Sequence, residues 1–250
     1  MIETRRTFHV QLDEVTRDIV RLAAYVTEMI PKGTEALLSG DLQSLQEVID
    51  SDDEPDELSV WIEDQCYQIL ALQQPMATDL RAIIAAIRLA SEIERSGDLV
   101  VNICKGARRV YPFEISPTIR GLIEQMSEQA AKLFRLSMDA YVEHDAGLAA
   151  ALDDMDDTLD ILHKQYIETL LSQEHEGDLQ EAVQFALIGR YYERIGDHAV
   201  NIGEQIRYMV DGWLPEHAGA ARMAARRAAT TDSDAVVTAD SDASADETGD

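Results

Sequence analysis

A ten-residue stretch that occurs twice constrains the fold of this 250-residue chain more than any other feature. The copies are Glu94-Arg-Ser-Gly-Asp-Leu-Val-Val-Asn-Ile103 and Glu193-Arg-Ile-Gly-Asp-His-Ala-Val-Asn-Ile202, which agree at seven of ten positions with an offset of 99 residues. That offset is much longer than the repeat of a solenoid protein. The sequence therefore indicates a duplicated domain.

In both copies, two acids interrupt an apolar face at helical spacing. Steps of four and three residues give Leu80, Ile84, Ile87, Ser91, Glu94, Asp98 and Val101 in the first copy, and Leu179, Val183, Ala186, Arg190, Glu193, Asp197 and Val200 in the second. Such a face packs against neighbouring helices. Two like charges are costly there unless a cation or hydrogen-bond donors neutralise them. We therefore interpret the acid pair as the functional feature of each half.

Apolar periodicity predicts three long helices in each half and no strand. The first half has one helix over residues 8–30, which ends at Pro31. A second covers residues 42–72, with Pro55 at a first turn or a kink, and a third runs from Thr78, its N-cap, to about residue 111. The second half has one helix from Pro117 to about Tyr141. A second helix follows the break at His144 and Asp145 and extends beyond Tyr166, and a third follows the break at Gly177 and ends near Gly212.

The chain is thus predicted to be an all-α protein, a tandem duplication of a three-helix bundle. We expect one bundle over residues 1–112, a second over 113–214 and a disordered acidic tail over 215–250. The last nineteen residues, 232–250, contain seven acids and no base, a composition typical of disorder.

Composition excludes several classes of function. The 48 acids and 21 bases give a net charge of −27, which disfavours nucleic-acid binding and suits a cytoplasm of high salt, as in halophiles. The two cysteines form no framework, and the sequence has neither a signal peptide nor an apolar stretch that could span a membrane. We expect a soluble cytoplasmic protein that is not inserted into a membrane.

A second acid pair recurs at an offset of 104 residues. Asp52 and Asp56 correspond to Asp156 and Asp160, again four residues apart. Together with the motif acids, each half then offers four carboxylates from two facing helices: Asp52, Asp56, Glu94 and Asp98 in the first, and Asp156, Asp160, Glu193 and Asp197 in the second. Carboxylates in this arrangement could hold a divalent cation, iron or zinc. Alternatively, nearby arginines neutralise the acids without metal, namely Arg95, Arg190 and Arg194.

The chain resembles the PhoU family over residues 8–212. The resemblance rests on both Glu-Arg-x-Gly-Asp motifs, on Gln74-Pro75-Met-Ala-Thr78-Asp79-Leu80-Arg81 and on the acid pairs above. It implies two three-helix bundles with metal clusters at their surfaces, and a homodimer. It also implies a non-enzymatic, cytoplasmic negative regulator that binds the phosphate ABC transporter, a phosphate-signalling kinase, or both. The second half departs from the pattern, because Gln180 replaces Arg81.

Two other functions stay open. A di-metal carboxylate enzyme of the ferritin-like type would carry Glu-x-x-His, but Gly97 and Gly196 stand where those histidines would be. A helical adaptor without metal would use its acids only for solubility. Asn102 and Asn201, four residues after each motif Asp, are donors to the carboxylates or simple contacts between helices. We expect His163 and His198 on helix surfaces.

Overall fold

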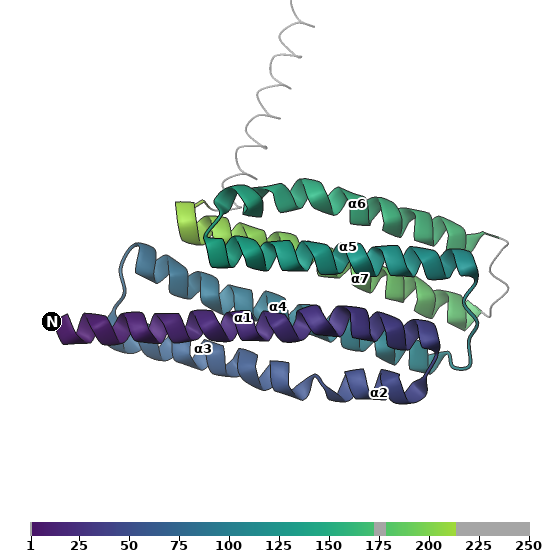
Figure 1. The fold of residues 1–250 in the computed structure, drawn as a ribbon, viewed down its shortest axis with the longest axis horizontal. Helices are drawn as coiled ribbons and strands as arrows, with labels where there is room; N and C mark the ends of the chain where they lie inside the picture. The colour runs from purple at the N-terminus through teal and green to yellow at the C-terminus, as the bar shows by residue number, and fades with distance from the viewer. Residues whose placement is uncertain (1, 173–178, 214–250) are drawn as a thin grey trace, which may run out of the picture. The chain divides into compact units, whose positions relative to one another are not determined.

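Helices make up nearly all of the chain that this computed structural model describes, which is residues 2–172 and 179–213. Within those ranges there are seven helices and no strand (Figure 1). They are α1 (Ile2–Ser39), α2 (Leu42–Asp50), α3 (Asp53–Gln73), α4 (Thr78–Arg109), α5 (Pro117–Glu143), α6 (Ala146–Leu171) and α7 (Leu179–Asp211). The all-α prediction is confirmed. The predicted acidic tail and the break at Gly177 lie outside the described residues.

The first helix continues through Pro31, so the predicted end at this residue is wrong. Proline inside a helix removes one backbone donor and costs roughly 3 kcal/mol. Ile30 and Leu37, on either side, are fully buried at 0% exposure. Gly33 also lets Val100 of α4 pack closely against α1. Burying each large aliphatic side chain contributes about 1.5–3 kcal/mol, so packing outweighs the lost hydrogen bond.

The helix predicted over residues 42–72 is in fact two helices, α2 and α3, separated at residues 51–52. Asp52 occupies the N-cap position of α3, but its carboxylate makes no capping hydrogen bond. Pro55 lies in the first turn of α3, which is one of its two predicted roles. A proline is tolerated there because the first turn has no intrahelical partner for its N–H.

Two helix starts follow their sequence signals and one does not. Ser116 and Asp145 cap α5 and α6 by accepting hydrogen bonds from backbone N–H groups of the first turn. The prediction of Thr78 as the N-cap of α4 is wrong, because Thr78 is the first helical residue and Ala77 precedes it with a φ of 53°. The Thr78 hydroxyl instead accepts a hydrogen bond from Arg81 Nη2 at 3.3 Å.

The two motif helices, α4 and α7, pack antiparallel and join the halves of the molecule. Hydrogen bonds from three arginines of α4 connect them along their length. Arg81 Nε donates to Met209 O at 3.4 Å, Arg88 Nη1 to Gln205 Oε1 at 3.1 Å, and Arg109 Nη1 to Gln184 Oε1 at 3.5 Å. This register places the two motif copies opposite each other. α1 and α3 pack on α4, whereas α5 and α6 pack on α7 (Figure 1).

The described residues up to Gly212 form one compact unit. The division of this unit into bundles at residue 112 stays a prediction. None of the described helices has a stretch long and apolar enough to cross a bilayer.

A glycine of α7 allows close contact with α6. A methyl group on Gly203 would lie 2.7 Å from the backbone oxygen of Ala149 and 2.9 Å from Leu152 Cδ1. The carbonyl oxygen belongs to a helix backbone and cannot move away cheaply. The backbones of α6 and α7 therefore approach each other only because position 203 lacks a side chain.

We predict that Gly203→Ala lowers the free energy of unfolding by about 1–3 kcal/mol, because the added methyl forces the helices apart. Gly121→Ala in α5 is the control, since nothing lies within 4 Å of a methyl at that position. It is expected to raise stability by about 0.5–1 kcal/mol through helix propensity. Chemical denaturation of both variants checks this, and equal effects at the two positions would contradict the packing argument.

Candidate functional site

The motif acids lie at the edges of the helix interfaces. In α4 the buried face runs through Ile93, Gly97 and Val100, whereas Glu94 is partly buried and Asp98 is exposed. The prediction that these acids occupy the inward seam is therefore wrong by one helical position. At this edge, Glu94 and Asp98 keep access to water, which lowers the cost of holding their charge near apolar neighbours, whereas the side chain of Glu193 in α7 is only 13% exposed.

The four predicted acids of the first half form one cluster between α3 and α4, consisting of Asp52, Asp56, Glu94 and Asp98. Burial, followed by repulsion from Asp56 and Asp98, raises the pKa of Asp52 to about 6. Burial and neighbouring carboxylates also raise the pKa values of Asp56 and Glu94 above their usual range. Such mutual effects require short separations. The structure thus brings these four residues together.

The second cluster, between α6 and α7, contains a more deeply buried acid. Asp156 is only 8% exposed, and its Oδ1 is buried without a hydrogen-bond partner. Burial, followed by repulsion from Asp160 and Asp197, raises its pKa to about 7. Asp156 is therefore half protonated near neutral pH. Its Oδ1 is available to accept a hydrogen bond or to ligate a cation.

The two clusters are built alike around the motif glycines. A Cβ on Gly97 would lie 3.8 Å from Asp52 Oδ1, and a Cβ on Gly196 would overlap the carboxylate of Asp156. Asp52 and Asp156 are equivalent positions of the repeat, at the offset of 104 residues. Gly97 and Gly196 are equivalent at the offset of 99 residues. The duplication inferred from sequence is thus reproduced in these positions; the missing side chain of Gly196 provides the room that Asp156 needs, whereas a Cβ on Gly97 would make only ordinary van der Waals contact with Asp52.

Sequence reasoning missed two acids of the second cluster. A cavity of about 460 Å³ is lined there by Asp153, Asp156, Asp157, Asp160, Asp197, Val200 and Asn201. On α6, Asp153 lies about one turn before Asp156, and Asp157 follows Asp156 directly. The run of four acids within residues 153–157 was the available signal. These acids bring additional negative charge to the α6 side of the cluster.

An arginine distinguishes the second cluster from the first. Arg190 forms an ion pair with Glu193, and its Nη2 lies 3.7 Å from Asp197 Oδ2. The corresponding position in the first half is Ser91. Burial and the nearby Arg190 charge lower the pKa of His163, whose Nε2 is buried without a partner. His163 is partly buried, so its predicted position on the helix surface is only partly correct.

The other candidate residues have separate positions. Arg95 and Arg194 are exposed. The charge of Arg95 favours the ionised form of Glu94, but burial has the larger effect, so the pKa of Glu94 is raised. Asn102 is partly buried in α4. Arg81 lies away from both clusters and donates to the last turn of α7 at Met209 O, where a cation is favourable to the helix dipole.

A polar contact across the α4–α7 interface was not foreseen. Glu92 Oε2 accepts a hydrogen bond from Asn201 Nδ2 at 3.0 Å and lies 2.6 Å from His198 Nδ1. Burial by itself would raise the pKa of Glu92, but the hydrogen bonds with His198 and Asn201 and the electrostatic effects of His198 and Arg95 together lower it below its usual value. His198 is 6% exposed, so the prediction of a surface histidine is wrong. Asn201 makes the inter-helix contact that was one of its two predicted roles.

The acid clusters have suitable ligands for a hard cation, but their side chains are not gathered around one point. Within the described ranges, no group of three His, Cys, Asp or Glu side chains is placed to hold a metal ion. Carboxylate oxygens are the donors that such ions prefer, and the unpartnered Asp156 Oδ1 is a free one. Asp56, Asp98 and Asp160 are exposed, so their rotation toward a common ion meets little obstruction.

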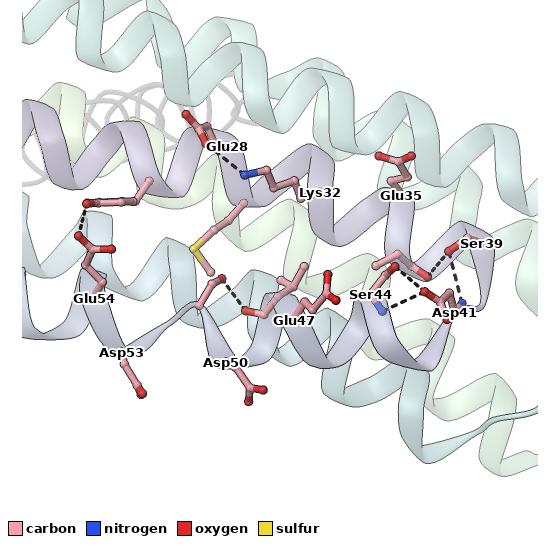
Figure 2. Close-up of a pocket in the computed structure, with 15 residues that line it drawn as sticks. Glu28, Lys32, Glu35, Ser39, Asp41, Ser44, Glu47, Asp50, Asp53 and Glu54 are labelled. Atoms are coloured by element: carbon pink, nitrogen blue, oxygen red, sulfur yellow. Dashed lines mark hydrogen bonds and ion pairs between the residues drawn. The ribbon is translucent and has the colours of Figure 1, made fainter.

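A second cavity, of about 860 Å³, lies between α1, α2 and α3, and its lining includes Ser51 and Asp53, the chain neighbours of Asp52 (Figure 2). Its walls carry seven acids and one base: Glu28, Glu35, Asp41, Glu47, Asp50, Asp53, Glu54 and Lys32. Some of these acids already have partners, since Lys32 Nζ lies 3.2 Å from Glu28 Oε2 and Asp41 caps α2. Such a lining repels anions, so this cavity is no candidate for phosphate.

We predict that Asp156→Asn stabilises the protein when chelator has removed any metal. The folded pKa of about 7 exceeds the ordinary value of 3.8, so ionised Asp156 opposes folding increasingly as pH rises from 4 to 7. The variant should exceed the wild type by roughly 1–3 kcal/mol at pH 8, and the gain should shrink toward zero near pH 4. Urea unfolding at both pH values checks this. A gain that does not depend on pH would show that Asp156 is an ordinary acid.

We also predict that Glu92 and His198 are energetically coupled. A double-mutant cycle with Glu92→Gln and His198→Leu should give a coupling of about 1–2 kcal/mol, because each side chain is partly or fully buried against the other. Glu28 and Lys32 are the control pair, with side chains 69% and 65% exposed. Their coupling should stay below about 0.5 kcal/mol. Similar couplings in the two cycles would contradict the prediction.

Comparisons with known proteins agree with the duplicated architecture. The PhoU domain model matches residues 19–107 and 123–206, one match in each half. The phosphate-specific transport system accessory protein PhoU homolog 1 of Mycobacterium tuberculosis is 32% identical over 212 residues, which cover 84% of this chain and 96% of that protein. PhoU homolog 2 of the same species is also 32% identical, with coverage of 84% and 100%.

Solved structures show the same fold. The crystal structure of PhoU from Pseudomonas aeruginosa superposes with a TM-score of 0.77 at 28% identity, covering 82% of this chain and all of that chain. PhoU from Streptococcus pneumoniae gives a TM-score of 0.76 at 24% identity, covering 83% and 98%. The matches extend over both halves and over nearly the full length of the relatives. The chain therefore belongs to the PhoU domain family.

Proposed function

We propose that this protein is a cytoplasmic negative regulator of phosphate uptake and phosphate-responsive signalling. The observation that carries the proposal is its match to proteins named as accessory to the phosphate-specific transport system, over 96–100% of their length. An accessory protein acts by binding, so the partners would be the cytoplasmic subunits of the phosphate ABC importer and a phosphate-signalling kinase. On this proposal the chain is not an enzyme, and it acts as a homodimer.

The acid clusters are proposed to hold cations and so to set the state of the binding surface. Asp52, Asp56, Glu94 and Asp98 would hold one ion or cluster, and Asp156, Asp160, Glu193 and Asp197 another. A bound divalent cation, iron or zinc would supply positive charge that offsets the mutual repulsion of these carboxylates. Cation binding would therefore stabilise the contacts of α3 with α4 and of α6 with α7.

Direct recognition of phosphate is not part of this proposal. The clusters and the cavity between α1, α2 and α3 are lined mainly by carboxylates, which repel an anion. The sequence contains no glycine-rich loop of the kind that cradles phosphate. Phosphate status would instead reach this protein through its partners.

The proposal is tested in cells that lack the gene and grow with abundant phosphate. Intracellular phosphate and polyphosphate should exceed the wild-type amounts, with an importer that stays active, and the intact gene should restore both. Unchanged phosphate handling would refute the regulatory role and leave only the shared fold.

The importance of the acid clusters is tested with Asp98→Asn combined with Asp197→Asn. We expect this pair to restore regulation poorly, because it removes one carboxylate from each cluster. Asp64→Asn combined with Asp139→Asn makes the same change of charge at exposed positions outside the clusters and should restore it fully. Full activity of both pairs would favour a helical adaptor without metal. A purified protein that consumes oxygen and absorbs light like an oxo-bridged di-iron centre would favour the enzyme.

A further inference from the structure

The two acid clusters have equivalent carboxylates but different neighbours. In the second cluster, the guanidinium of Arg190 lies between Glu193 and Asp197, paired with the first and 3.7 Å from an oxygen of the second. In the first cluster, Ser91 stands at the equivalent position. The cations acting on Glu94 and Asp52 of the first cluster are Arg95 and Lys105, whose effects on the pKa values are smaller than those of burial and of the carboxylates of Asp56 and Asp98.

We propose that Arg190 is a built-in counter-ion that competes with solution cations for Glu193 and Asp197, and so makes the second cluster the weaker cation site of the two. This inference rests on the cation binding proposed above. Among the differences between the clusters, Arg190 is the one that opposes cation binding, because the four duplicated carboxylates are the same in type and spacing and the further acids Asp153 and Asp157 only add negative charge.

Competition follows from the geometry of the guanidinium. Its N–H groups bind the same carboxylate oxygens that a metal ion needs, and both interactions cannot use one lone pair. The side chain of Glu193 is only 13% exposed, so few other partners can reach it. Arg190 itself is 47% exposed, and it can therefore swing toward solvent when a stronger cation binds.

The acids that Arg190 does not contact show that the second cluster still lacks positive charge. Asp156 Oδ1 is buried without a hydrogen-bond partner. Asp153, Asp157 and Asp160 line the same cavity from α6. A cation entering this cavity thus meets the carboxylates of α6 and that of Asp197, but must displace Arg190 to reach Glu193 and the Asp197 oxygen that lies near the guanidinium.

Mn²⁺ is a suitable probe, because it prefers oxygen ligands and its free form is counted by electron paramagnetic resonance. We would titrate the full-length protein and four variants: Arg190→Ser, which copies the first half, Arg190→Gln, which keeps more of the side-chain volume, Ser91→Arg, and Arg194→Ser. Arg194 is the matched control, since it is an exposed arginine of the same helix. Circular dichroism confirms that each variant is folded.

Both Arg190 variants should bind Mn²⁺ at the second cluster at least about tenfold more tightly than the wild type, because a nearby unit charge is removed. Adding Asp160→Asn should abolish this gain, whereas adding Asp56→Asn should not. Ser91→Arg should weaken the first cluster. Arg194→Ser should change the affinity less than about threefold, because its exposed charge is screened.

An affinity gain in the Arg190 variants no larger than that in Arg194→Ser would overturn the inference, whether or not the wild type binds Mn²⁺. A first cluster unaffected by Ser91→Arg would also count against it. A wild type that binds no Mn²⁺, beside Arg190 variants that do, would leave the inference standing while refuting the cation sites of the proposed function.

Discussion

Repulsion between carboxylates is the constraint on which both halves of this molecule depend. Each half places two acids of one helix beside two acids of the next, at positions where burial already penalises charge. The arrangement is tolerated because the acids lie at the edges of the interfaces and, in the second half, because Gly196 leaves space for Asp156. The net charge of −27 on the whole chain adds to the same repulsion.

Much of the fold was predictable because helical periodicity and duplication are properties of the local sequence. Both motif helices, the break near His144 and the end of α7 were found in this way. Pro31 was misread because its local cost is overcome by the burial of Ile30 and Leu37, which depends on helices far away in the chain. The break at residues 51–52 itself carries neither glycine nor proline; its local signal was Pro55, which lies in the first turn of the helix that follows and was equally compatible with a kink.

The clusters were predictable to the extent that they follow from spacing. Two offsets, 104 and 99, were enough to match Asp52 with Asp156 and one motif with the other. Which side of α4 faces inward was not predictable to within one residue, because acids and apolar residues alternate around the helix. The contact of Glu92 with His198 depends on the register of α4 against α7, across 106 residues of sequence. Short-range patterns contain no information about that register.

The contact of Glu92 with His198 and Asn201 also makes the two halves non-interchangeable. By the offset of 99, Glu92 corresponds to Tyr191, and His198 corresponds to Leu99. Two copies of the first half would set Glu92 against leucine and leave its carboxylate without an imidazole partner. Two copies of the second half would lose the carboxylate altogether. After duplication, each half has thus become the specific complement of the other, and a protein assembled from either half repeated would lack the contact between carboxylate and imidazole.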